Sequence, residues 1–310
     1  MEDYPRNLIE LEKRFDTEEA CLEYLIQIRW PEGFQCPKCR YKKAWFTKRS
    51  LFHCEQCGFQ TSPIVGTLFQ DTKKPLSLWF RAMWHVTSQK YGANALGLQR
   101  ILGLGSYHTA WRWLHKLRRA MVRPGRDRLS GRIEVDEAYI GGKKPGKRGR
   151  GAEGKALVVV MVDISGDKIG RIRLKRVKDA SAQSLQGAIK ESVEPGSEVC
   201  TDDWRGYGDL PAIGYTRTVI RDDSVVGENL LPSVNRVVAL LKRWLLGTYQ
   251  GGINLSHLDY YLDEYTFRFN RRTSRSRGKL FYRLVQQAIA IEPILVKDIY
   301  GGSKNTGNVG

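Results

Sequence analysis

Two pairs of cysteines near the N-terminus constrain the fold more than any other feature of this 310-residue sequence. They are Cys36-Pro-Lys-Cys39 and Cys54-Glu-Gln-Cys57, with fourteen residues between them. Each CxxC turn can present two thiolates to one side of an ion, and zinc prefers four such ligands in a tetrahedron. The spacing predicts a zinc ribbon with a structural ion, since four sulfur ligands leave no open position for catalysis. A redox dithiol is the alternative, but this segment lacks the strand and helix that usually flank one.

The net charge and the hydropathy of the sequence indicate which kinds of partner the protein can bind. The net charge of +18 and the pI near 9.7 favour a polyanion, with double-stranded DNA ahead of an anionic membrane or a merely solvated basic surface. The sequence shows no signal peptide and no apolar run of the roughly 18 residues that a membrane span needs. We therefore expect no membrane partner and a reducing, cytoplasmic setting, in which Cys21 and Cys200 are buried thiols.

A helical segment follows the ribbon, from Leu76 to about Met121. Its second half predicts a helix, a turn around Gly103 and Gly105, and another helix that begins at Ser106 or Tyr107. This order is typical of a helix-turn-helix, in which the start of the second helix reads DNA bases. A plain helical hairpin with a solvated basic face is the alternative. The candidate DNA-binding residues here are Ser106, Tyr107, His108, Arg112 and Lys116.

The pattern after Gly131 changes to that of an α/β domain. RIEVDEAYI alternates as a strand, which puts Glu134, Asp136 and Ala138 on one face. ALVVVMVDI and GRIRLKRV predict a hairpin, a helix follows from about Ala180 to Val193, and SEVCT and YTRTVI predict two further strands. This succession describes a ribonuclease H-like fold, a mixed five-stranded sheet with helices, in which the first and fourth strands are neighbours.

That arrangement would bring Asp136 and Asp202 to one point. Two carboxylates there suit Mg²⁺ or Mn²⁺, hard ions that take oxygen ligands and keep waters for substrate phosphates. By position, a third ligand should come from the helix that begins at PSVNRVVALLKRW, where Asn235 stands. Taken singly, Asp136 could equally be a strand-end aspartate in a salt bridge, and Asp202 or Asp203 a turn residue.

Several motifs together resemble the DDE-superfamily insertion-sequence transposases that carry an N-terminal zinc ribbon. They include GFQTSPIVGTLF, IEVDEAYIGG, TDDWRGY and FRFNRRTSRSRGKLFYRL, and the resemblance runs from about residue 15 to about residue 290. It implies a ribonuclease H-like catalytic domain, metal-dependent strand cleavage and joining, and recognition of terminal inverted repeats. It also implies catalytic residues Asp136, Asp202 rather than Asp203, and Asn235, with Lys242 contacting DNA.

The amide of Asn235 leaves the expected site one negative charge short of three carboxylates. Asn235 could instead cap its helix, a position for which Pro232 and Ser233 compete. Glu228 and Glu264 are the carboxylates that could replace it as a ligand. Lys242 stands seven residues after Asn235, close to two helical turns, so both should share one helix face.

Two basic segments are further candidates for phosphate contact, with a solvated face as the alternative. One is the glycine-rich stretch GGKKPGKRGRG, expected to be mobile until DNA orders it. The other is FRFNRRTSRSRGKLFYR, which has aromatic residues among its basic ones. The candidates in the second segment are Arg271, Arg272, Arg275 and Arg277.

The expected organisation has four parts: residues 1–72 with the ribbon, 73–128 with the helix-turn-helix, 129–295 as the catalytic domain, and a disordered tail at 296–310. The predicted function is that of an insertion-sequence transposase acting at transposon ends and target DNA. We expect a homo-oligomer, in a prokaryotic cytoplasm at the nucleoid. The alternatives are an inactive DNA-binding regulator and a ribonuclease H-like nuclease without strand transfer.

Overall fold

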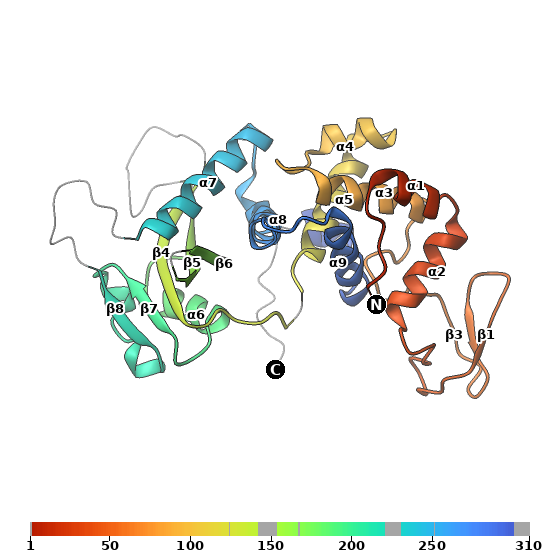
Figure 1. Cartoon of the computed structure of the whole chain (residues 1–310), viewed down its shortest axis with the longest axis horizontal. Helices are drawn as coiled ribbons and strands as arrows, with labels where there is room; N and C mark the ends of the chain where they lie inside the picture. The colour runs from red at the N-terminus through yellow and green to blue at the C-terminus, as the bar shows by residue number, and fades with distance from the viewer. Residues whose placement is uncertain are drawn as a thin grey trace. The chain divides into compact units, whose positions relative to one another are not determined.

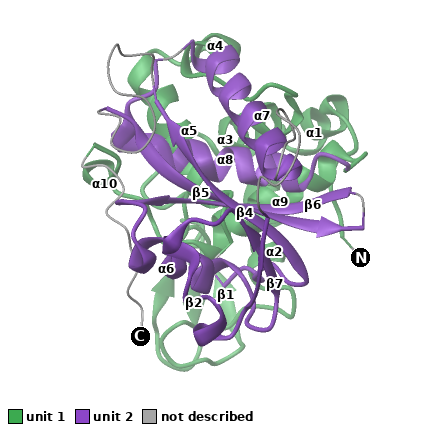
Figure 2. Cartoon of the chain, turned by 90° about the vertical axis from the view of Figure 1, so that its left-hand side faces the viewer, with its two compact units in different colours: residues 1–124, 274–300 green, residues 125–273, 301–310 purple. Residues whose placement is uncertain are grey.

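The computed structural model describes residues 2–123, 125–141, 154–166, 168–220, 231–250 and 252–300. Contacts divide the chain into two compact units, shown in different colours in Figure 2. The first unit combines residues 1–124 with residues 274–300, and the second begins at residue 125 and runs to residue 273. The predicted boundaries at 72, 128 and 295 stay predictions, but residues 274–295 group with the N-terminal helices rather than with the sheet.

The first unit is mainly helical and carries a small three-stranded sheet (Figure 1). Its core is aromatic: Trp79 stacks on Trp113 with ring centroids 3.8 Å apart, and Phe80 meets Phe281 at 5.6 Å. Its helices and strands are α1 Leu8–Arg14, α2 Glu18–Arg29, β1 Ala44–Phe46, β2 Phe52–Cys54, β3 Gln60–Thr61, α3 Leu76–Ser88, α4 Ala95–Leu102, α5 Tyr107–Ala120, α9 Arg277–Ala290 and α10 Val296–Tyr300.

Local signals explain the turn between α4 and α5. The side chain of Asn94 caps α4, and α4 ends at Gly103, whose φ of 61° is left-handed and so favours glycine. Ser106 then caps α5 by accepting the N–H of His108 at 3.2 Å. The predicted helix, turn and helix are therefore present at the expected residues.

The predicted disorder of the tail is wrong for its first five residues. Residues 296–300 form α10, and Ile299 is fully buried. The ring of Tyr300 stacks on Trp111 of α5 at 5.5 Å, which explains why this short segment is ordered. Residues 301–310 lie outside the described residues.

The second unit contains the predicted mixed sheet, with strand order β6-β5-β4-β7-β8. Strands β4, β5 and β6 pair antiparallel, whereas β7 pairs parallel to both β4 and β8. This confirms the ribonuclease H-like order expected from the sequence. The elements are β4 Arg132–Ile140, β5 Ala156–Ser165, β6 Lys168–Val177, α6 Ala182–Ser192, β7 Glu198–Thr201, η1 Arg205–Tyr207, η2 Pro211–Ile213, β8 Thr216–Val219, α7 Pro232–Tyr249, η3 Leu255–His257 and α8 Leu258–Asn270.

Alternation along β4 gives the sheet two apolar faces. Ile133 and Val135 pack with α6 on one face, while Ala138 and Ile140 pack with α7 and α8 on the other. Figure 1 shows α7 above the sheet and α6 below it. The face parity predicted for β4 is therefore correct, and it places Glu134 and Asp136 on the α7 side. Within the described residues, no helix combines the length and apolarity needed to cross a membrane.

The N-terminal segment of the first unit packs closely on α9. A Cβ at Gly278 would lie 1.8 Å from the carbonyl oxygen of Pro5, so only glycine fits there. Glu2 pairs with Lys279 at 3.2 Å and also with Arg283 of the same helix. The segment thus joins the start of the chain to a helix more than 270 residues later.

We expect Gly278→Ala to destabilise the protein by about 1–3 kcal/mol, because the added methyl group overpacks a backbone contact. Gly187→Ala in α6 is the matched control, since nothing lies within 4 Å of its Cβ position. The control should be neutral or stabilising by about 0.5–1 kcal/mol through better helix propensity. Urea unfolding of both variants measures the difference, and equal midpoints would contradict the close contact.

Candidate functional site

The two predicted catalytic aspartates lie on, or just after, neighbouring strands of the sheet. Parallel strands β4 and β7 pair Arg132 with Glu198 and Glu134 with Cys200. The pairing ends there, with Asp136 and Asp202 each two residues further along its chain. Cys200 belongs to the core cluster beneath α7, so the residues of this parity on both strands face that helix.

The loop that carries Asp202 is held by hydrogen bonds. The Asp202 carboxylate accepts the backbone N–H of Trp204 at 3.1 Å. From β8, Arg217 donates to the Asp202 carbonyl at 3.0 Å and to the Thr201 hydroxyl at 3.2 Å. Asp202 is half-buried, whereas Asp203 is exposed. These contacts fix the backbone and the carboxylate of Asp202.

A buried tyrosine connects the two acidic motifs. The Tyr207 hydroxyl donates to Glu137 at 2.7 Å across 70 residues of sequence. Burial raises the pKa of Tyr207, and the negative charges of Glu137, Asp136 and Asp202 raise that pKa further. All three carboxylates therefore lie within electrostatic range of one hydroxyl. The sequence analysis did not single out Glu137, Tyr207 or Arg217, although each lies within or close to a matched motif.

Asn235 is not the helix cap. Leu231 occupies that position of α7 without a side-chain hydrogen bond, and the Asn235 N–H already donates to the Leu231 carbonyl at 3.0 Å. The capping alternative for Asn235, and for Ser233, is therefore wrong. Asn235 and Lys242 are both exposed, and their spacing puts them on one face of α7.

Glu264 and Glu228 are the carboxylates that could replace Asn235 as the third ligand. Glu264 is only 1% exposed, and its carboxylate pairs with Arg268 at 2.8 Å and accepts from the Tyr249 hydroxyl at 3.1 Å. A buried carboxylate already paired in this way is unsuited to ligate an ion. Glu228 lies outside the described residues. Of the candidate third ligands that the structure describes, Asn235 remains.

The four ribbon cysteines come together as predicted. The Sγ atoms of Cys36 and Cys57 lie 3.7 Å apart, those of Cys39 and Cys54 lie 3.6 Å apart, and all four lie within 4.8 Å of one another. Zinc–sulfur bonds of about 2.3 Å in a tetrahedron require sulfurs about 3.8 Å apart. The cluster fits a structural zinc ion. Cys21 and Cys200 are buried elsewhere, as expected.

The predicted DNA-reading residues divide into exposed and engaged groups. Tyr107 and His108 are exposed at the start of α5, next to the cap Ser106. Arg112 instead donates to the Tyr300 hydroxyl at 3.2 Å and lies over its ring. Lys116 is half-buried, and this burial lowers its pKa, an effect that Asp71 opposes. The first turn of α5 is therefore the accessible part of this helix.

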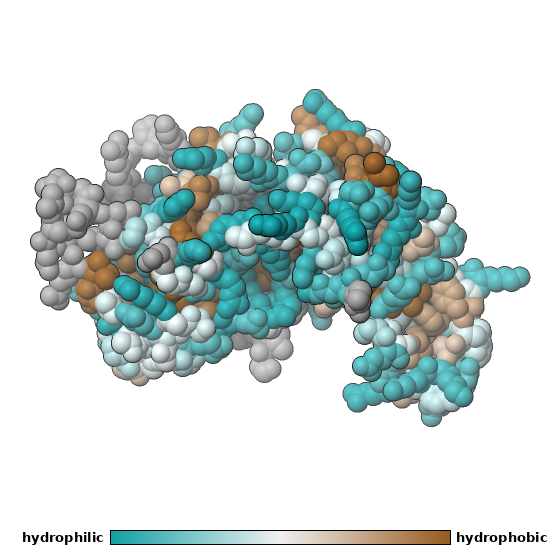
Figure 3. Space-filling view, in the orientation of Figure 1, coloured by the Kyte–Doolittle hydropathy of each residue, from teal (hydrophilic) through white to brown (hydrophobic). Residues whose placement is uncertain are grey.

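The basic segment near residue 270 divides similarly. Arg271 and Arg272 stack on Phe267 and Phe269, each with its guanidinium carbon 4.1 Å from the ring centroid. Both also donate to backbone carbonyls, so these side chains have structural roles. Arg275 and Arg277 are exposed. Hydrophilic residues cover much of the face shown in Figure 3.

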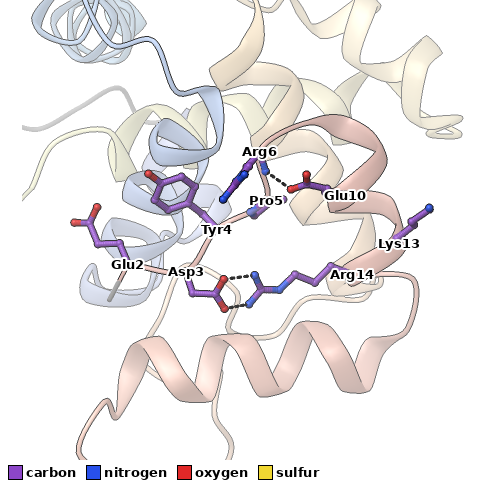
Figure 4. A pocket seen from close by; sticks show the side chains of 8 residues that line it. All are labelled: Glu2, Asp3, Tyr4, Pro5, Arg6, Glu10, Lys13 and Arg14. Carbon is purple, nitrogen blue, oxygen red and sulfur yellow. Dashed lines mark hydrogen bonds and ion pairs between the residues drawn. The ribbon is translucent and has the colours of Figure 1, made fainter.

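A pocket of about 680 Å³ lies elsewhere, against the N-terminal segment (Figure 4). Several of its polar groups are paired: Arg14 binds the Asp3 carboxylate with both terminal nitrogens, and the Arg6 N–H donates to Glu10 at 2.7 Å. Pairing with Arg14 lowers the pKa of Asp3. The pocket belongs to the packing of the first unit and contains none of the predicted catalytic residues.

The mixed five-stranded sheet and the four-cysteine ribbon occur together in this chain, as expected for a DDE-type transposase with a zinc ribbon. Comparison with known families specifies which kind. Residues 128–270 match the family described as "ISXO2-like transposase domain", and residues 16–60 match "Transposase zinc-ribbon domain". By these two matches, the chain is similar to the ISXO2-like DDE transposases with an N-terminal zinc ribbon.

Individual relatives are more distant. The chain is 27% identical over 290 residues to an "Uncharacterized protein in transposable element ISH50" of Halobacterium salinarum, covering 86% of this chain and 95% of that protein. Two solved structures also match. The Mos1 Strand Transfer Complex is 12% identical with a TM-score of 0.28, and covers 71% of this chain and 78% of that one. The Mos1 paired-end complex is 13% identical with a TM-score of 0.24, covering 66% and 79%.

We expect purified protein to contain one zinc ion per chain, and Cys39→Ser to lose it because three thiolates bind zinc far more weakly than four. Cys21→Ala is the control, since this buried thiol lies outside the cluster. Metal analysis with hydrogen exchange of residues 36–60 measures both effects. Retained zinc in Cys39→Ser, or its loss in Cys21→Ala, would refute the ligand set.

Proposed function

We propose that the chain is an active insertion-sequence transposase that binds terminal inverted repeats and catalyses DNA strand cleavage and strand transfer. Asp136, Asp202 and Asn235 form its active site in this proposal. The observation that carries it is the parallel register of β4 with β7, which pairs Glu134 with Cys200, each two residues before one of the proposed aspartates. The match of residues 128–270 to a transposase domain supports the same reaction class.

Oxygen ligands suit the divalent cation that this chemistry requires. The carboxylates of Asp136 and Asp202 and the amide oxygen of Asn235 would hold Mg²⁺ or Mn²⁺, since both ions prefer hard oxygen donors. Bound there, the metal would activate a water or a 3′-hydroxyl and stabilise the leaving oxygen at phosphorus. The donor set carries two negative charges, so DNA phosphate should contribute more to metal binding than it would beside three carboxylates.

The chain's own residues would orient the DNA. Lys242 lies two turns beyond Asn235 on the exposed face of α7, where its ammonium group can bind a phosphate next to the reacting one. Tyr107 and His108 can meet base edges from the first turn of α5. Arg275 and Arg277 add exposed cations, and the net charge of +18 favours DNA in general.

The remaining parts of the proposal concern the cell and the assembly. Acting on transposon ends and target DNA places the protein with the nucleoid in a prokaryotic cytoplasm. Two ends must be joined to one target, so we propose a homo-oligomer as the active form.

Asp136→Ala and Asp202→Ala should abolish cleavage and strand transfer, because each removes a metal-binding carboxylate. Asn235→Ala should reduce both severely, by about 10²-fold or more if the amide supports the metal. Asp203→Ala, one residue from the site and exposed, is the control and should retain activity. Supercoiled plasmids carrying a pair of inverted repeats provide the assay, with Mg²⁺ and Mn²⁺ tested separately.

Two results would change the assignment. Full activity of Asn235→Ala together with loss in Glu228→Gln would move the third ligand to Glu228. DNA binding without cleavage by the wild-type protein, with either metal, would favour a DNA-binding regulator instead.

Lys242→Ala should weaken binding to transposon-end DNA and reduce the salt dependence of that binding by roughly one phosphate contact. The physical reason is the loss of one ammonium–phosphate pair. Arg243→Ala is the matched control, because this exposed cation is adjacent in sequence but about 100° further around α7. Fluorescence anisotropy at several salt concentrations measures the slope; the same slope change in both variants would argue against a specific role for Lys242.

A further inference from the structure

Helix α7 begins without a cap of its own. Leu231 stands at the N-cap position and offers no side-chain acceptor, and Pro232 at the first helical position has no N–H. The next two N–H groups, of Ser233 and Val234, both donate to Oε2 of Glu134, at 2.9 and 3.1 Å. Glu134 belongs to β4, about 100 residues earlier. A strand of the sheet therefore caps this helix.

Both elements that meet at Glu134 also carry proposed ligands, Asp136 on β4 and Asn235 on α7. Along β4 it precedes Asp136 by two residues on the same face, a separation of about 7 Å. Along α7 the capped residue Val234 directly precedes Asn235. One carboxylate thus connects the strand that carries the first ligand to the helix turn that carries the third.

The contact between Glu134 and α7 also has an electrostatic effect, because the carboxylate is negatively charged. A helix N-terminus carries roughly half a positive charge, which opposes a divalent cation bound nearby. The 18 residues of α7 point that end toward the strand that carries Asp136. The negative charge of Glu134 offsets it, in a site that has only two carboxylates among its three proposed ligands.

We infer that Glu134 is a positioning residue for the active site: its carboxylate holds the first turn of α7, and with it Asn235, against β4, and neutralises the helix terminus beside the metal. The inference rests on the proposed function. Its role in this inference is to hold α7 rather than to ligate the metal, since its Oε2 accepts two backbone N–H groups of that helix.

Two substitutions separate the hydrogen bonds that Glu134 makes to α7 from the effect of its negative charge. Glu134→Ala removes the acceptor and should speed hydrogen exchange of the first turn of α7 about five- to tenfold, the effect of a lost helix cap. Glu134→Gln keeps an acceptor oxygen but loses the charge, so its exchange should change about twofold at most. Exchange of peptides from residues 231–241, in zinc-loaded full-length protein without Mg²⁺ or Mn²⁺, measures both.

The effect of the Glu134 charge is measured by the Mg²⁺ concentration that cleavage requires. Glu134→Gln should raise the Mg²⁺ concentration needed for half-maximal cleavage about two- to fivefold, as expected for a charge at a helix terminus. Glu198→Ala is the control: this half-buried glutamate on β7 accepts from the Thr218 hydroxyl at 2.8 Å and is not the cap of α7. It should change neither exchange in α7 nor metal requirement.

Unchanged exchange in Glu134→Ala would overturn the inference, as would an unchanged metal requirement in Glu134→Gln. Should Glu134→Ala fail to fold, the Gln variant still decides the charge effect. Loss of cleavage in Asp136→Ala with no effect of either Glu134 variant would reject the positioning role and keep the proposed function. A wild-type protein that cleaves no transposon end would reject the proposed function, while the exchange comparison would still decide whether Glu134 holds α7.

Discussion

The parallel pairing of β4 with β7 is the constraint on which the second unit depends. It pairs β4, which precedes α6 in the sequence, with β7, which follows α6. In this register Ile133 and Val199 both face α6. The alternate positions of β4, among them Asp136, then face α7, as does Cys200 on β7. A shift of one residue in β4 would turn Asp136 to the other face, so the apolar packing of the sheet also sets the side on which this carboxylate lies.

Contacts between motifs hold this pair in place. Tyr207 reaches Glu137, Arg217 binds the loop around Asp202, and Glu134 meets the first turn of α7. Each of these residues lies near a proposed ligand in sequence or in space without being a ligand itself. The acidic motifs therefore carry two kinds of carboxylate, one kind for the proposed metal and another for holding the surrounding backbone.

Local patterns predicted much of the fold correctly. Alternation assigned the faces of β4, serine and glycine marked the turn before α5, and cysteine spacing predicted the ribbon cluster. The error on the start of the tail concerns a contact that local patterns do not record, since Tyr300 packs on α5. Local patterns also do not show that Arg112 and Arg272 donate to groups distant in sequence, or that Leu231 rather than Asn235 stands at the N-cap of α7.

The sequence by itself determined the element types, the faces of the strands and the four-cysteine cluster, because periodicity, capping and ligand spacing act over a few residues. Only the tertiary structure decided the interaction partner of each glutamate. Glu264 is buried against Arg268, Glu137 accepts from Tyr207, and Glu134 caps α7. Two of these three contacts join residues 70 to 100 positions apart. Such partners are chosen by the register of the sheet and by burial, neither of which a local pattern specifies.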